Sequence, residues 1–142
     1  MATALAMRTR TIRIGFSVLV LPLFEPIRLA DEIATLDVLS EGRVDRGVSR
    51  GNTSRYLEAW DLDYADRSGL FDAAFDKLTR YWTEPKVEVG SRTESIEPKC
   101  NQHPHPPIYV ATYREERAAW IGERGLTLCQ GTSNPYRASV AA

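Results

Sequence analysis

The sequence predicts an α/β protein built around a parallel sheet. Short apolar segments rich in β-branched residues alternate with longer segments whose apolar residues recur every three to four positions. These are the patterns of buried strands and of amphipathic helices. The resulting order is strand, helix, strand, helix, strand, helix, strand. Such alternation is typical of parallel strands joined by right-handed crossover helices, either in an open doubly wound sheet or in part of a (β/α) barrel.

The first half of the chain supplies two strands and one helix. Residues 12–21 read IRIGFSVLVL and predict a buried strand. Pro26 suits the first turn of the next helix, because its missing N–H is no loss there. Gly42 is expected to end that helix as a C-cap. Residues 43–49 then predict the second strand.

The second half continues the alternation. Residues 52–65 predict a loop, and Asp66 is expected to cap a helix over residues 66–82. The polar, proline-rich stretch 84–107 predicts an extended excursion. The last elements are a strand over 106–112, a helix over 114–125 that Gly125 ends, and a strand over 126–130.

Candidate binding residues fall at one edge of this sheet. Ligands bind parallel sheets where strands end and loops begin. Pro22, Arg50 and Thr112 follow three of the predicted strands and are therefore expected to lie near one another. Arg50 is a fixed positive charge between two glycines at such a strand end, which makes it the first candidate.

Composition predicts an ordinary globular protein with one domain over residues 1–142. The chain has 43% hydrophobic and 26% charged residues and a formal net charge of −1, which gives no case for nucleic acid or an anionic membrane as partner. Cys100 and Cys129 lack the spacing of a metal or redox motif, which indicates reduced thiols in a cytoplasmic protein. The apolar run 14–24 is interpreted as a strand rather than a signal peptide, and it is too short to span a bilayer.

Two histidines and one strand arginine carry further expectations. His103 and His105 stand one residue apart without acidic or cysteine partners nearby, so no metal site is expected and no catalytic residue is assigned. Arg46 shares one strand face with Val44 and Val48. If that face packs on helices, a buried unpaired charge is costly, and replacing Arg46 by Leu is expected to raise the melting temperature.

The stretch RTIRIGFSVLVLPLFEPIRLADEIATLDVLSEGRVDRGVSRGN resembles the luciferase-like flavin monooxygenases. In that family a strand ending in Leu-Pro leads to a helix of the pattern P-x-x-x-A-x-x-x-A-x-L-D-x-L-S-x-G-R, and a strand of the type G-x-x-R-G follows. The matching positions are Pro26, Ala30, Ala34, Leu36-Asp37, Leu39-Ser40, Gly42-Arg43 and 47–51. The segments RYWTEP and HPHPPIYVA…GERGL also resemble later family elements, so the resemblance extends over residues 5–130.

The resemblance implies a partial TIM-type (β/α)₈ barrel. The four strands would be the third to the sixth of the family barrel, with the helices outside, and Met1 would fall within the second helix. The family domain is roughly twice as long as this chain. Strands 12–21 and 126–130 are then expected at the two edges of the sheet. The interior face is expected to show Gly15, Ser17, Gly47 and Ser49.

The resemblance also implies a function. Family members use reduced FMN and molecular oxygen to oxygenate a small organic substrate, and a flavin reductase is a possible partner. Two alternatives stay open: a deazaflavin-dependent reductase of the same superfamily, and a non-catalytic remnant that acts only in binding or assembly. Because a half barrel exposes strand edges, a homodimer or an aggregate is expected, with weak flavin binding and no turnover unless the other half is supplied.

Arg50 corresponds to the family arginine that contacts the flavin phosphate. The guanidinium fork suits phosphate oxygens, and the flanking glycines let the backbone approach the anion. Ser49 and Gly51 belong to the same segment. The alternative is an ion pair between Arg50 and a loop carboxylate, Asp61 or Asp63.

Two further positions carry over from the family. Ser17 and Val18 correspond to a place where many members have a non-prolyl cis peptide beneath the flavin ring. With half of the barrel absent, we expect this bond to be trans. Thr112 matches a Ser or Thr that binds phosphate together with the following helix N-terminus, although Tyr113 and Arg114 stand where Ser is frequent.

Overall fold

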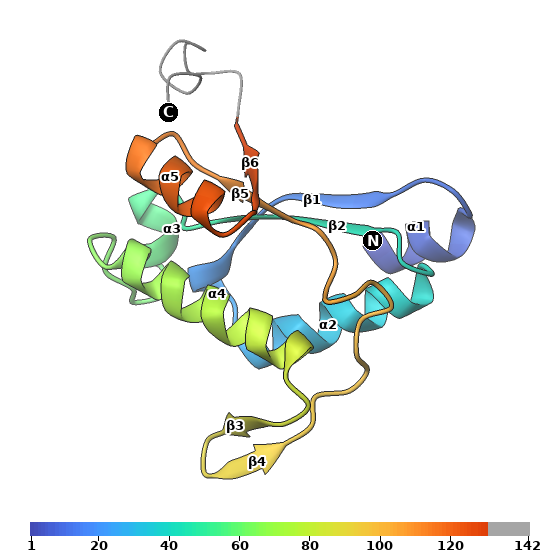
Figure 1. Ribbon diagram of the computed structural model, residues 1–142. Helices are drawn as coiled ribbons and strands as arrows, with labels where there is room; N and C mark the ends of the chain where they lie inside the picture. Colours follow the sequence, from blue (N-terminus) through green and yellow to red (C-terminus); the bar gives the residue numbers. More distant parts are fainter. Residues whose placement is uncertain (131–142) are drawn as a thin grey trace.

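The structure is a computed structural model that describes residues 1–130. The main sheet contains β1 (Ile14–Val20), β2 (Val44–Ser49), β5 (Ile108–Ala111) and β6 (Thr127–Cys129). The strands lie in the order β1-β2-β5-β6, and each neighbouring pair is parallel. The predicted α/β class, the sequence order of the strands and the two edge strands β1 and β6 are therefore confirmed (Figure 1).

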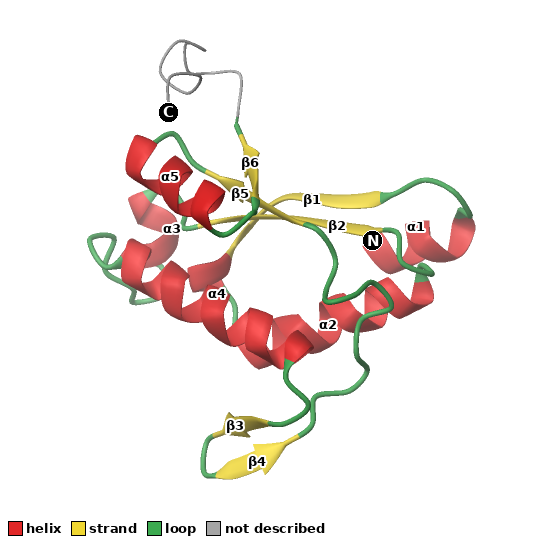
Figure 2. Ribbon diagram, viewed as in Figure 1, coloured by secondary structure: helices red, strands yellow, loops and turns green. Residues whose placement is uncertain are grey.

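The helices connect these strands. They are α1 (Ala2–Arg8), the 3₁₀ helix η1 (Leu21–Leu23), α2 (Pro26–Leu39), α3 (Ser54–Glu58), α4 (Arg67–Thr83) and α5 (Glu115–Glu123). α2 and α4 lie together on one side of the sheet (Figure 2). Trp82 on α4 donates from its indole Nε1 to the carbonyl of Ala30 on α2 at 3.1 Å, which fixes the two helices against each other.

The hydrophobic core fills the space between the sheet and these two helices. Val44 and Val48 of β2 are at most 1% exposed and face the helices. Alternate residues on β2 point the other way because side chains alternate along a strand. The helix side of the core is formed by Leu29, Ala30, Ile33, Phe71, Phe75, Leu78 and Trp82. On the opposite face Gly15 and Ser17 are exposed, as expected for a sheet whose second face lacks cover.

Two predicted irregular stretches contain regular structure. The expected loop 52–65 includes the five-residue helix α3. The expected extended excursion 84–107 includes an antiparallel hairpin of β3 (Val87–Val89) and β4 (Arg92–Glu94). Both elements are too short to show a helical or strand period in the sequence, so periodicity did not reveal them.

The two glycines predicted to end helices are confirmed, but the predicted N-terminal capping residue is not. Gly42 and Gly125 adopt φ values of +80° and +62°, the left-handed conformation that ends helices. Asp66 occupies the N-cap position of α4, but its side chain accepts no capping hydrogen bond. Its backbone is helical (φ −83°, ψ −3°), whereas a capping residue is normally extended.

β1 contains an irregularity beside a glycine of β2. The pairing register shifts between Phe16 and Leu19, and the peptide bond between Ser17 and Val18 is cis. The expectation of a trans bond is therefore wrong. The neighbours of this stretch come from within the chain: a Cβ on Gly47 would lie 2.4 Å from the Phe16 carbonyl oxygen and 2.8 Å from Val18 Cγ1.

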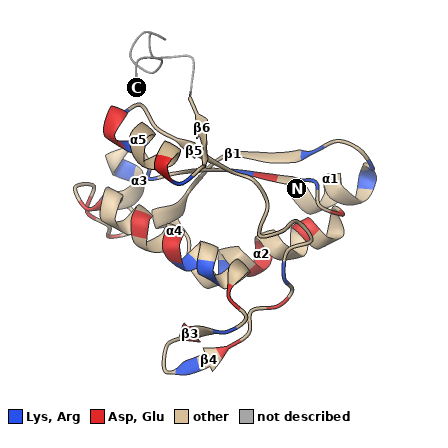
Figure 3. Ribbon diagram, in the orientation of Figure 1, with Lys and Arg blue, Asp and Glu red and all other residues tan. Residues whose placement is uncertain are grey.

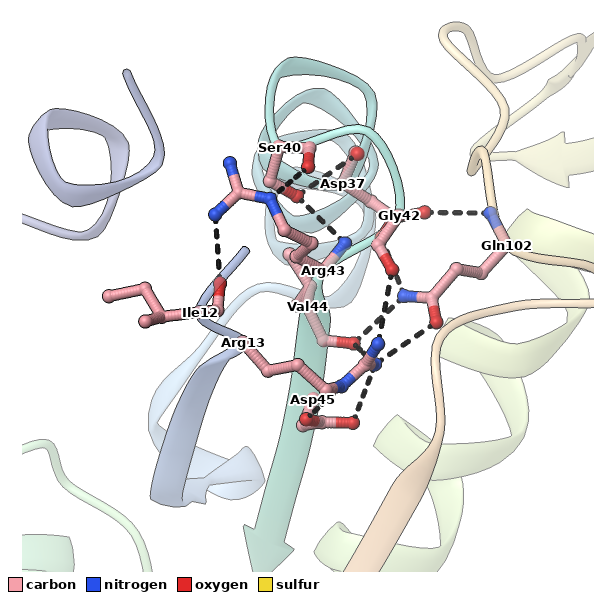
Figure 4. Close-up of polar contacts among 9 residues, drawn as sticks. All are labelled: Ile12, Arg13, Asp37, Ser40, Gly42, Arg43, Val44, Asp45 and Gln102. Atoms are coloured by element: carbon pink, nitrogen blue, oxygen red, sulfur yellow. Dashed lines mark hydrogen bonds and ion pairs between the residues drawn. The ribbon is translucent and has the colours of Figure 1, made fainter. Parts of the chain in front are cut away.

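A polar network joins the start of β2 to the segment before β5 (Figure 4). Gln102 donates from its backbone N at 2.9 Å and from Nε2 at 2.7 Å to the buried carboxylate of Asp37. Its Nε2 also donates to the Val44 carbonyl at 2.8 Å. Arg13 binds Asp45 with two hydrogen bonds of 2.7 and 2.9 Å. The two hydrogen bonds from Gln102 replace the water that the buried Asp37 carboxylate loses on folding.

Arg46 is fully buried on the helix-facing side of β2. Its guanidinium stacks on the Trp82 ring at 3.8 Å, and Nη2 donates to the Pro106 carbonyl at 2.6 Å. Nε and Nη1 have no hydrogen-bond partner. Burial lowers the pKa of Arg46 to about 9. The predicted buried charge is present, with one carbonyl, the Nδ1 of His105 at 3.4 Å and one aromatic ring in place of a carboxylate.

Acidic and basic residues are mixed along the helices (Figure 3). Cys100 and Cys129 are free thiols, and Cys100 is buried. Within residues 1–130, none of the helices combines the length and the apolar character that crossing a membrane requires.

Candidate functional site

A cavity of about 370 Å³ lies where β1, β2 and β5 end. This volume falls within the range of small-molecule sites. Its lining consists of Val18, Val20, Ser49, Arg50, Gly51, Asn52, Tyr64, Arg67, Ala111, Thr112, Tyr113 and Arg114. The lining contains three arginines and no carboxylate, so the cavity has the electrostatic character of an anion site.

Arg50 follows the last residue of β2 and projects toward the start of α4. Its Nη1 donates to Ser68 Oγ at 2.7 Å, and it forms no ion pair with a described carboxylate. The alternative pairing with Asp61 or Asp63 is therefore not found. Burial, followed by the charges of Arg67, Arg114 and Arg117, lowers the pKa of Arg50. Of these neighbours, Arg117 is itself paired with Asp72 at 2.6 Å.

Arg67 is the first residue of α4 and forms a second arm of the cavity. Its guanidinium stacks over the Tyr64 ring at 3.8 Å, and Nη1 donates to the Tyr64 carbonyl at 2.5 Å. Its Nε is buried without a hydrogen-bond partner. Tyr64 is held in turn by a 3.2 Å hydrogen bond from its hydroxyl to the Asn52 carbonyl.

Thr112 closes the cavity after β5. It is 9% exposed, and its Oγ1 accepts a hydrogen bond from the Arg114 backbone N at 3.1 Å. This bond shapes the turn into α5, which begins at Glu115. Arg50 and Thr112 also line a small neighbouring void with Arg117, so the expected proximity of Arg50 to Thr112 is confirmed.

Gly51 gives the loop after β2 its course. Its φ is +84°, and a Cβ there would lie 3.0 Å from Val20 Cγ1. A side chain at this position would be strained both by the backbone conformation and by the close contact with Val20. The Gly51 backbone N also donates weakly, at 3.4 Å, to Ser49 Oγ, which keeps the strand end and the loop together at the cavity.

The structure brings together most of the predicted site residues. Those that line the cavity are Val18, Ser49, Arg50, Gly51 and Thr112. Ser17 precedes them on β1 and is exposed outside the lining, and Pro22 lies in η1 beyond it.

The two histidines lie elsewhere. His105 precedes the N-terminal end of β5 and contacts Trp82, with ring centroids 6.1 Å apart. The cavity is at the opposite, C-terminal strand ends, so His105 does not contribute to it. Among residues 1–130 there is no group of three or more His, Cys, Asp or Glu side chains placed to hold a metal ion.

Sequence reasoning missed Tyr64 and Arg67. Both fall where the pattern changes from loop to helix, and helical periodicity identifies only the buried stripe of α4. One signal was available: Arg67 stands in the first helical turn, where the helix dipole disfavours cations, and that turn contains no acidic residue.

Comparison with known proteins identifies related sequences. The family model for luciferase-like monooxygenases matches residues 1–142. An uncharacterized protein of Sinorhizobium fredii is 31% identical over 95% of this chain and 41% of its own length. The oxygenase component of a flavin-dependent trigonelline monooxygenase from Acinetobacter baylyi is 32% identical over 75% of this chain and 31% of its own length.

Solved structures match the fold. Monooxygenase RslO1 from Streptomyces bottropensis superposes with a TM-score of 0.85 at 28% identity, covering 94% of this chain and 43% of that chain. The FMN complex of the oxygenating constituent of 3,6-diketocamphane monooxygenase from Pseudomonas putida has a TM-score of 0.73 at 19% identity, covering 91% and 41% of the two chains. The coenzyme F420-dependent tetrahydromethanopterin reductase of Methanopyrus kandleri has a TM-score of 0.70 at 19% identity, covering 86% and 40%.

These matches also set the extent of the shared structure. The chain spans 31% to 41% of the length of the two curated relatives. The structural neighbours are TIM-barrel proteins, and the four parallel strands with their helices cover only part of each.

Proposed function

Because the chain belongs to the luciferase-like monooxygenase family, we propose that it forms the phosphate-binding part of a flavin-dependent oxygenase. The observation that supports this is the cavity at the C-terminal strand ends, where Arg50 and Thr112 meet and no carboxylate is present. The complete barrel would use reduced FMN and molecular oxygen to oxygenate a small organic substrate.

The residues present suit the phosphate end of FMN. Arg50 has donors left over after its bond to Ser68. Thr112 offers a hydroxyl on the other side of the cavity. Val18, Val20 and the exposed face of β1 would support the flavin ring, with Ser17 and Ser49 at its margin.

Each group has a limited task in this proposal. Arg50 binds and orients the phosphate, and Thr112 holds the turn before α5 so that the phosphate end is enclosed. The apolar side chains of β1 exclude water from one side of the ring. The bound reduced flavin supplies the electrons for oxygen activation, and these residues supply position and electrostatics.

The proposal extends to partners and location. A separate flavin reductase would deliver the reduced cofactor, as expected of an oxygenase component. A cytoplasmic location fits the free thiols of Cys100 and Cys129. Weak binding of the ring is expected in this chain alone, because the sheet face that would carry it is open.

Flavin titration tests the proposal. FMN and riboflavin share the ring, and only FMN has the phosphate. We expect Arg50→Ala to weaken FMN binding at least about tenfold and to leave riboflavin binding unchanged, because a charge-assisted contact to phosphate contributes about 1.5–3 kcal/mol. Fluorescence quenching of each flavin measures both affinities. Equal FMN affinity in the wild type and the variant would reject the role of Arg50.

A second experiment addresses the reaction. The flavin-loaded complete protein is reduced without oxygen and then given an oxygen pulse, while absorbance follows flavin reoxidation. Oxygenation of added substrate supports the monooxygenase. Selective binding of a deazaflavin with no response to oxygen would support the reductase alternative, and retention of neither cofactor would support a non-catalytic role.

A further inference from the structure

We propose that His105 is an acid-sensitive latch on residues 100–107, the segment that leads into β5. While the imidazole ring is neutral, this segment is held against Arg46 and Trp82. When the ring takes up a proton, a second positive charge faces the buried guanidinium of Arg46, and the segment loosens from β2 and α4. The inference concerns a conformational device in the fold and is independent of the flavin proposal.

The latch is built from contacts just before the N-terminal end of β5. The Nδ1 of His105 lies 3.4 Å from Arg46 Nη2 and 3.0 Å from the Pro106 carbonyl oxygen. Arg46 Nη2 donates to the same carbonyl at 2.6 Å. The imidazole ring also lies against the Trp82 ring, with centroids 6.1 Å apart. His105 therefore joins the segment before β5 to β2 and, through Trp82, to α4.

Arg46 supplies the positive charge that opposes protonation of His105. It is fully buried, its Nε and Nη1 have no hydrogen-bond partner, and none of the ion pairs among residues 1–130 includes it. Its pKa of about 9 keeps it charged at neutral and acid pH. A proton on His105 thus creates two positive charges whose nearest nitrogen atoms are 3.4 Å apart. Like charges repel strongly in such water-poor surroundings.

This repulsion does not depend on the tautomer of the neutral ring. If the proton is on Nε2, Nδ1 accepts a hydrogen bond from Arg46, and protonation also removes that acceptor. If the proton is on Nδ1, His105 donates to the Pro106 carbonyl, and protonation adds only the charge. The Pro106 carbonyl can accept from a protonated ring, but it already accepts from Arg46, so it offsets only part of the repulsion.

The other titratable groups around the latch do not compensate for a second charge. Cys100 is buried, and burial raises its pKa to about 12, so its thiol is neutral. The carboxylate of Asp37 on α2 attracts Arg46, but it is already bound by the backbone and side chain of Gln102. α4 contributes the Trp82 ring, which does not titrate. Among the described residues, Arg46 is the charged side chain that acts on His105.

The direction of the pH dependence follows from these surroundings. Burial is the largest cause of the lowered pKa of His105, and the Arg46 charge acts in the same direction, while the Pro106 carbonyl opposes both. An open segment with a solvated ring therefore binds a proton more readily than the closed segment does. As the pH falls below the ordinary pKa of histidine, the open form gains population, and above that pH the latch stays closed.

Cys100 reports the opening of the segment. It is 4% exposed, so a thiol reagent reaches it only when the segment lifts from its neighbours. Cys129→Ser leaves Cys100 as the one thiol of the chain. In this background, the rate of labelling by a dithiodipyridine is measured at about pH 7.5 and about pH 5. The acid-to-neutral rate ratio is compared between variants, so the pH dependence of the reagent and of the thiol cancels.

The His105→Gln variant should lose the acid opening, because glutamine takes up no proton. We expect the acid-to-neutral rate ratio of the His105 protein to exceed that of His105→Gln at least about threefold. His103→Gln is the matched control, since His103 is an exposed histidine two residues away, and its ratio should equal that of the parent. Equal ratios for His105→Gln and the parent would overturn the proposal, including the case in which acid opens the whole protein without involving His105.

An NMR titration of the His105 ring tests the role of Arg46 separately. Arg46→Met removes the charge and retains an apolar contact with Trp82, so the pKa of His105 should rise relative to the wild type. Arg28→Met removes an exposed arginine and should leave the His105 titration unchanged. Circular dichroism confirms the fold of each variant. A His105 titration that is the same in folded Arg46→Met and in the wild type would also overturn the proposal.

Discussion

Individual residues in this chain differ in how far the sequence explains them. Arg50 could be placed at the sheet edge, because a residue that follows a parallel strand lies at the C-terminal edge whatever the details of packing. Arg67, which lines the same cavity, could not be placed there from the sequence. Helical periodicity locates the buried side of α4 and gives no information about where the helix begins. The burial of Arg46 could be predicted because it shares a strand face with Val44 and Val48, whereas its contact with Trp82 depends on how α4 packs.

Replacing Arg46 should stabilise the fold. Arg46→Met retains length and an apolar contact with Trp82 and removes two unpaired buried donors. It loses the hydrogen bond to the Pro106 carbonyl and the 3.4 Å contact with His105 Nδ1. We expect unfolding free energy to rise by about 1–2 kcal/mol at pH 7, measured by urea denaturation. Arg46→Leu should also raise the melting temperature, and Arg46→Ala should lower it by leaving a cavity. A drop in stability for Arg46→Met would contradict this account.

The same residue predicts a pH effect. Burial lowers the pKa of Arg46 to about 9 in the folded state, well below the ordinary pKa of a solvated arginine in the unfolded chain. Between these values the unfolded state binds more protons, so rising pH favours the folded wild type. The stability advantage of Arg46→Met should therefore be constant below about pH 9 and shrink above it. Urea titrations of both proteins from pH 7 to 10.5 measure the difference, and a constant advantage across this range would refute the shift.

At the scale of elements, length decided what the sequence could reveal. The long helices α2 and α4 and the strands β1 and β2 show clear periods. The helix α3 and the strands of the β3–β4 hairpin have five and three residues each, too few to display one. The family resemblance pointed to the Ser17–Val18 position in β1, but the cis bond found there was not expected.

Gly47 should be required where β1 and β2 meet. A Cβ there would lie 2.4 Å from a backbone oxygen of β1, and backbone cannot move aside as a side-chain end can. Gly47→Ala should destabilise the protein by about 1–3 kcal/mol through overpacking. Gly69→Ala is the control, because nothing lies within 4 Å of its Cβ position and alanine favours the helix. Equal melting temperatures for Gly47→Ala and the wild type would contradict the close approach.

At the scale of the whole molecule, the sheet formed by residues 1–130 has two edge strands without a further partner. β1 and β6 end the sheet, and unpaired strand edges promote association with other chains. Parallel order and edge identity were predictable because alternation and crossover handedness leave few topologies. The number of strands in a complete barrel was implied by the family resemblance alone.

The exposed edge of β1 predicts that the chain associates with copies of itself. The 142-residue chain should elute as a concentration-dependent dimer or larger species in size-exclusion chromatography with light scattering. Gly15→Lys should shift it toward monomer, because Gly15 is exposed on β1 with nothing within 4 Å of its Cβ position and a lysine blocks edge pairing. Gly122→Lys adds the same charge on α5 in equally open space. A wild-type monomer at all concentrations, or equal effects of both variants, would contradict edge-mediated association.

The β3–β4 hairpin offers a practical handle on this protein. It projects beyond α2 and α4, away from the main sheet (Figure 1), and Gly90 in its turn is exposed with φ +61°. Exposed tight turns accept inserted peptides better than packed elements do. A short epitope or dye-acceptor sequence inserted after Gly90 would therefore label the chain so that its binding to other polypeptides can be detected. The arginine-lined cavity and the β1 edge would keep their native sequence.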